Sequence, residues 1–146
     1  MTRPRVVLAD DRASMARQLR ALLLPSCDVV EVVSDGAALV AAVDALEPDV
    51  IVTDIAMPGV SGMAAARIIR SRHPAARVIF LTIRDEPELI REAAHIGALG
   101  YVMKGDAGDE LAIAVHAAMA GVQYVSTSAR AVWHQGDAPD SSGDKP

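Results

Sequence analysis

The chain has 146 residues, 51% of them hydrophobic, and a formal net charge of −5. This length suits one domain with a tail rather than two generous domains. The sequence holds no apolar stretch near the roughly 20 residues of a membrane span, and it reaches charge too early for a signal peptide. The acidic balance argues against nucleic-acid binding by this chain itself. We therefore expect a cytoplasmic protein with no membrane partner.

The single cysteine, Cys27, excludes an internal disulfide and has no ligand-spaced partner for a structural zinc site. Short β-branched runs alternate with helical patterns about every 20 to 30 residues, which is typical of βα units. The five expected strands are RVVLA, DVVEVV, DVIVT, RVIFLT and GYVM. Near-continuous apolar strands favour a parallel sheet buried on both faces. With right-handed crossovers, this predicts a doubly wound five-stranded α/β fold.

Proline and glycine mark the expected helix ends. Pro48 stops the second helix, Pro87 lies near the start of the fourth, and Gly97 closes the fourth. We expect a folded domain over residues 1–122 and a C-terminal extension over residues 123–146. The extension could begin with a short helix in STSARAVWHQ, where Trp133 is expected to pack loosely. The acidic end, GDAPDSSGDKP, is expected to be disordered.

Polar residues follow the predicted strands at one edge of the sheet, where open parallel sheets carry their sites. Asp10 and Asp11 follow the first strand, Asp54 the third, Thr82 ends the fourth, and Lys104 follows the fifth. Taken alone, either acid of the pair would be a helix N-cap. Their occurrence at four strand ends favours a shared site. Clustered carboxylates need a cation, and a site with only oxygen ligands suits Mg²⁺.

These residues resemble the receiver domain of two-component response regulators. The resemblance runs from about Arg5 to Gly121 and is carried by ADD, DIAMPGVSG, LT and GYVMK in order. It implies a flavodoxin-like sheet with strand order 2-1-3-4-5. Gly105 follows Lys104 where many receivers have a cis proline, and we expect a trans peptide there.

The resemblance also implies a role for each site residue. Asp54 would be the phosphoacceptor. Asp11 would bind Mg²⁺ directly, Asp10 would act on the metal through water, and the Ala56 backbone carbonyl would be a further ligand. Thr82 and Lys104 would bind phosphoryl oxygens, and Tyr101 would change rotamer with Thr82.

A receiver is not an enzyme in its own right but a switch that a histidine kinase phosphorylates. The implied output surface combines the fourth helix, fifth strand and fifth helix, and it could support a homodimer. The ending GYVMKGDAGDEL...AGVQYVS resembles receivers that precede a helix-turn-helix domain, so transcription control would use a domain absent from this chain.

Other interpretations stay open. The chain could be a stand-alone phosphorelay or protein-interaction receiver, and a pseudo-receiver that binds partners without phosphorylation is disfavoured by the intact polar set. An aspartate-dependent phosphohydrolase would need an acid at position 56, where this chain has alanine. A flavin-binding domain is weaker still, because the acidic edge would repel a phosphate.

Overall fold

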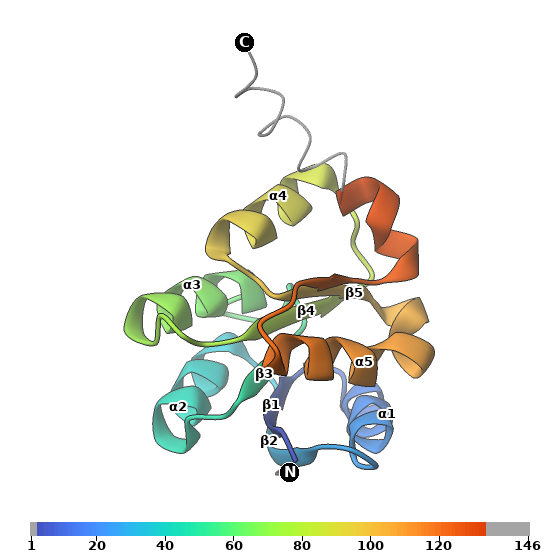
Figure 1. The fold of residues 1–146 in the computed structure, drawn as a ribbon. Coiled ribbons are helices and arrows are strands. Elements are labelled where there is room, and N and C mark those ends of the chain that lie inside the picture. The colour runs from blue at the N-terminus through green and yellow to red at the C-terminus, as the bar shows by residue number, and fades with distance from the viewer. Residues whose placement is uncertain (1–2, 134–146) are drawn as a thin grey trace.

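The computed structural model describes residues 3–133 (Figure 1). The expected disordered end, residues 136–146, lies outside this range. Strands and helices alternate along the chain. They are β1 Arg5–Ala9, α1 Ala13–Leu23, β2 Asp28–Val33, α2 Gly36–Leu46, β3 Val50–Thr53, α3 Gly62–Arg72, β4 Val78–Thr82, α4 Pro87–Ile96, β5 Gly100–Met103, α5 Ala107–Met119 and β6 Tyr124–Val125, with short 3-10 helices at Lys104–Asp106 and Thr127–Ala129.

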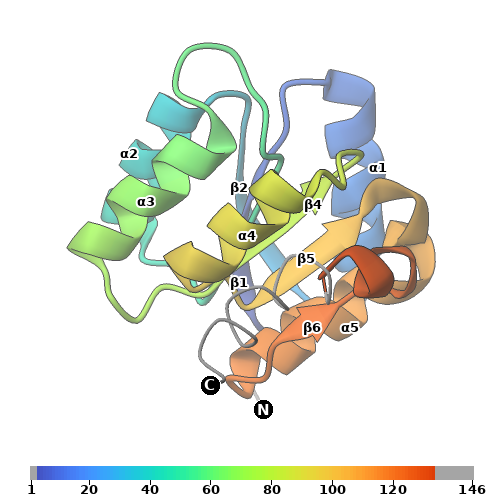
Figure 2. The same cartoon turned by 90° about the horizontal axis from the view of Figure 1, so that it is seen from above.

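The sheet is entirely parallel, with the order β2-β1-β3-β4-β5-β6. The predicted α/β fold and the order of the first five strands are confirmed. The expected count of five strands was one short, because β6 pairs in parallel with the outer edge of β5 (Figure 2). Two residues are too few to show any alternation of apolar and polar side chains, so periodicity could not reveal this strand.

Helices cover both faces of the sheet, as Figures 1 and 2 show. One apolar core joins the sheet to α2, α3 and α4, and Leu39, Ile69 and Ile90 are among its fully buried members. The other core joins the opposite face to α1 and α5 through Leu19 and Leu111. Burial on both faces explains why β3 and β4 are apolar at nearly every position. Among the described residues, none of the helices has the length and apolar character needed to cross a membrane.

The helix ends follow local chemistry. Asp35 and Ser61 are the N-caps of α2 and α3, and their side chains accept hydrogen bonds from Ala38 N at 2.8 Å and Ala64 N at 3.1 Å. Pro87 occupies the first turn of α4, as predicted. Gly97 ends α4 with a φ of 88°, a left-handed conformation that glycine adopts without strain.

Residues 124–133, called here the C-terminal segment, pack on the core. The expectation that Trp133 packs loosely was wrong: it is only 5% exposed, and its ring centroid lies 5.9 Å from that of Tyr101. The expected short helix is seen in part, since residues 130–133 are helical. The division at residue 122 stays a prediction about domain organisation. Sequence alone could not place Trp133, because its partner Tyr101 is distant in the chain.

Gly62, the first residue of α3, is required by a close backbone approach. A Cβ atom at this position would lie 1.7 Å from the carbonyl oxygen of Asp54. We predict that Gly62→Ala lowers the free energy of unfolding by at least about 2 kcal/mol, because the backbone beside Asp54 must move. Chemical denaturation would measure this loss.

The matched control is Gly108→Ala in α5, where an added Cβ would meet nothing within 4 Å. Alanine is a better helix former than glycine, so the free energy of unfolding of this variant should rise by about 0.5–1 kcal/mol. Equal stabilities of the two variants would contradict the close approach at Gly62.

Candidate functional site

Three carboxylates meet where β1 and β3 end. Asp10 and Asp11 follow β1 directly, Asp54 follows β3, and each offers an oxygen within 4.8 Å of the others. Backbone hydrogen bonds hold the two strand ends: Asp54 N donates to Ala9 O at 3.0 Å, and Asp10 N donates to Val33 O at 3.0 Å. The predicted convergence of these acids at one sheet edge is therefore present in the fold.

Lys104 supplies the positive charge. Its Nζ lies 2.9 Å from Asp54 Oδ2, to which it donates a hydrogen bond, and 3.0 Å from Asp10 Oδ2. The side chain is only 5% exposed. Burial by itself would lower the pKa of Lys104, but the hydrogen bond to Asp54 and the nearby negative charge of Asp10 outweigh it and leave the pKa above its ordinary value. The ammonium therefore stays charged.

One ammonium does not neutralise three carboxylates. Asp10 is 2% exposed, and its Oδ2 is buried without a hydrogen bond among the described residues, although Lys104 Nζ lies 3.0 Å away as an ion-pair partner. Leaving a charged oxygen so poorly satisfied is costly. A hard divalent cation held by oxygen ligands would remove this cost. Asp10, Asp11 and Asp54 thus form a donor set that fits Mg²⁺.

The alternative role for Asp10 or Asp11 was that of an ordinary helix cap. The N-cap of α1 is instead Arg12, and no side chain caps it. Asp10 Oδ1 accepts a hydrogen bond from Arg12 N at 2.9 Å, which fixes the carboxylate in a local turn. One oxygen of Asp10 is therefore used structurally, and the other faces the cluster.

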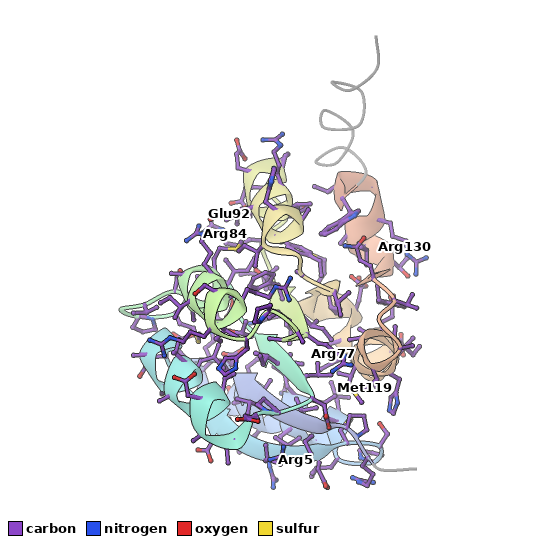
Figure 3. The ribbon with its side chains drawn as sticks, turned by 60° about the vertical axis from the view of Figure 1, so that its left-hand side comes forward. Arg5, Arg77, Arg84, Glu92, Met119 and Arg130 are labelled. Atoms are coloured by element: carbon purple, nitrogen blue, oxygen red, sulfur yellow. The ribbon has the colours of Figure 1, made fainter. Side chains whose placement is uncertain are left out.

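Thr82 and Tyr101 are linked through one backbone unit. Arg84 N donates to Thr82 Oγ1 at 3.0 Å, and the Tyr101 hydroxyl donates to Arg84 O at 2.6 Å. Both side chains are buried, and burial raises the pKa of Tyr101 well above its ordinary range. Figure 3 labels Arg84 below α4. The sequence offered no signal for Arg84, because its backbone rather than its side chain makes the link.

The loop after Asp54 also turns back on the site. Ala56 is exposed, and its N donates to Asp54 Oδ1 at 3.3 Å, so the backbone here lies next to the carboxylate. Its carbonyl as a metal ligand remains a prediction. All described peptide bonds are trans, including Lys104–Gly105, as expected.

Comparison with known proteins matches residues 6–116 to the response regulator receiver domain. The chain is 35% identical over 119 residues to the uncharacterized transcriptional regulatory protein YxjL of Bacillus subtilis, covering 80% of this chain and 55% of that protein. It is 36% identical over 113 residues to the probable transcriptional regulatory protein NarL of Mycobacterium tuberculosis, covering 76% and 52%. The chain thus spans about half the length of these curated relatives.

Solved structures agree. A LuxR-family two-component response regulator from Aurantimonas sp. superposes with a TM-score of 0.87 at 28% identity, covering 94% of this chain and 99% of that one. The isolated receiver domain of RcsB from Salmonella enterica, solved with the phosphomimetic BeF₃⁻, gives a TM-score of 0.82 at 25% identity, covering 90% and 99%.

This chain belongs to the response regulator receiver domain family, and its curated relatives are transcriptional regulators.

The uncompensated charge at this edge predicts a metal response. Mg²⁺ at ten times its dissociation constant should stabilise the native chain by about 1.4 kcal/mol, because the ion binds only the assembled carboxylates. Asp11→Asn should remove most of this gain, since it deletes one exposed charge of the cluster. Thermal unfolding with and without Mg²⁺ measures the effect.

Asp109→Asn is the matched control, because Asp109 is also exposed but lies on α5 outside the cluster. It should respond to Mg²⁺ like the native chain. If Asp11→Asn did the same, the carboxylate cluster would not be the metal site.

Proposed function

We propose that this chain is the phosphoacceptor receiver of a two-component system, in which a histidine kinase phosphorylates Asp54 in a Mg²⁺-dependent reaction. The observation that carries the proposal is the contact between Asp54 Oδ2 and Lys104 Nζ at 2.9 Å, inside a cluster with Asp10 and Asp11. A carboxylate held beside a buried cation and a potential metal site is suited to accept an anionic group. Membership of the receiver family supports the same role.

In the proposed reaction, an oxygen of Asp54 forms a bond to phosphorus while the bond from phosphorus to the donor histidine nitrogen breaks. Bound at Asp10, Asp11, Asp54 and the Ala56 carbonyl, Mg²⁺ would offset negative charge on the acids and the incoming group. Lys104 would exchange its contact with Asp54 for a phosphoryl oxygen. Thr82 would donate its hydroxyl hydrogen to another phosphoryl oxygen, since in the structure Thr82 Oγ1 acts as an acceptor, from Arg84 N.

The proposal also includes the surface that responds to phosphorylation. Phosphorylation would change a surface that includes α4, β5 and α5 and promote a homodimer, with Tyr101 turning in concert with Thr82. The outer edge of β5 pairs with β6, so β6 would contribute to this surface (Figure 2). Control of transcription would pass through a DNA-binding domain, in line with the longer transcriptional regulators to which the chain is similar.

The alternatives differ in the outcome of phosphorylation. A stand-alone phosphorelay or interaction receiver would use the same site with another output. A phosphohydrolase would need an acid at position 56 to activate water, and the alanine there does not provide one. The site residues therefore favour a switch over an enzyme.

Asp54→Asn should keep the fold but abolish phosphorylation, because the amide is nearly isosteric and lacks the nucleophilic oxygen. The measurement is intact mass after incubation with acetyl phosphate and Mg²⁺, where the native chain gains one phosphoryl group. Asp109→Asn should label like the native chain, and excess chelator should prevent labelling. Equal labelling of Asp54→Asn and the native chain would rule out Asp54 as the acceptor.

Phosphorylation should also change self-association. Sedimentation velocity with Mg²⁺ and beryllofluoride should show partial or complete dimerisation, because a ligand shifts a two-state equilibrium only by its differential affinity. Amide exchange should change between Glu88 and Met119. Unchanged association together with unchanged exchange would contradict the proposed output surface.

A further inference from the structure

The C-terminal segment, residues 124–133, is anchored beside the acidic site. Ser126 is fully buried, and its Oγ accepts a hydrogen bond at 3.0 Å from the backbone N of Met103, the residue before Lys104. Ser126 N in turn donates to Tyr101 O at 3.0 Å. The buried serine thus fixes the end of β5, from which Lys104 reaches Asp54.

Two carboxylates beyond Lys104 also hold this segment. Asp106 accepts from both the backbone N and the Oγ of Ser128, each at 2.9 Å. Glu110 accepts from the Tyr124 hydroxyl at 2.7 Å and from Thr127 N at 3.0 Å. The 3-10 helix that contains Lys104 is therefore held on both sides, by Ser126 before the lysine and by Ser128 after it. Arg130 lies on the outer side of the segment (Figure 3).

A second connection runs through Trp133. Its ring packs against the ring of Tyr101. The Tyr101 hydroxyl donates a hydrogen bond to Arg84 O, and Arg84 N donates one to Thr82 Oγ1. The segment consequently contacts the supports of Lys104 and Thr82, the two residues expected to bind phosphoryl oxygens. Lys104 contacts both Asp10 and Asp54, but the backbone of these acids has other supports, since Asp10 N bonds to β2 and Asp54 N bonds to β1.

We propose that Ser126 and Ser128 are positioning residues for Lys104, and that packing of the C-terminal segment and phosphorylation of Asp54 stabilise each other. The inference rests on the proposed function. Because linkage is reciprocal, a segment that holds Lys104 in place favours the phosphoryl group, and the bound group in turn holds the segment. Residues of the C-terminal segment then help to position the site, although they do not contact the phosphoryl group themselves.

The test separates phosphoryl binding from metal binding. Beryllofluoride is titrated at fixed Mg²⁺ and followed by ¹⁹F NMR, and Mg²⁺ is titrated alone and followed by thermal unfolding. Ser126→Ala leaves Met103 N–H without its acceptor, so half-saturation by beryllofluoride should require about 5-fold more ligand while the Mg²⁺ midpoint stays unchanged. Ser128→Ala removes an exposed contact, so half-saturation by beryllofluoride should require about 2-fold more ligand. This variant tests the positioning role if Ser126→Ala fails to fold.

Ser71→Ala is the matched control, because Ser71 is exposed on α3 and its hydroxyl donates a hydrogen bond within the same helix, to Ile68 O. It should bind both ligands like the native chain. Trp133, the one tryptophan in the sequence, gives a second readout: beryllofluoride should reduce its quenching by acrylamide.

Equal beryllofluoride affinities for the native chain, Ser126→Ala and Ser128→Ala would overturn the inference, as would a parallel loss of Mg²⁺ affinity. Unchanged or increased quenching of Trp133 would overturn the reciprocal stabilisation. If the native chain with Mg²⁺ bound no beryllofluoride, the proposed function itself would fail, an outcome distinct from failure of the positioning role.

Discussion

The site depends on an excess of negative charge. A single buried ammonium, that of Lys104, faces the three carboxylates of Asp10, Asp11 and Asp54. The lysine contacts two of them directly, yet it leaves Asp10 Oδ2 buried without a hydrogen bond. Such an arrangement is stable only because the sheet holds the acids rigidly, and it favours any ligand that brings positive charge. The folded sheet therefore favours binding of a divalent cation, and the added positive charge would in turn help the site to accept an anionic phosphoryl group.

The fold explains how this balance is maintained. Parallel strands bring residues distant in sequence to one edge, and burial of both sheet faces fixes the strand ends. Gly62 allows α3 to start against the carbonyl of Asp54, where any side chain would collide. At the other end of the site, β6 and Trp133 close the sheet edge beside β5. The site is thus bounded by the loop after β3 and by the C-terminal segment.

Much of this could be predicted from the sequence. Strand periodicity indicated the α/β fold, and the acids with Lys104 could be assigned to one edge because parallel strands align their carboxyl ends. What escaped prediction has no local signal. Strand β6 is too short for alternation, Trp133 finds its partner through tertiary packing, and Arg84 connects Thr82 to Tyr101 through its backbone. Such contacts depend on chain segments that meet only after folding.

We propose that Asp54, rather than a neighbouring acid, accepts the phosphoryl group. The most direct measurement is to phosphorylate the native chain with acetyl phosphate and Mg²⁺, reduce the acyl phosphate with borohydride, and locate the modified residue by peptide mass spectrometry. We expect modification at Asp54 alone. Modification at Asp10 or Asp11, or none at Asp54 despite a gain in intact mass, would contradict it.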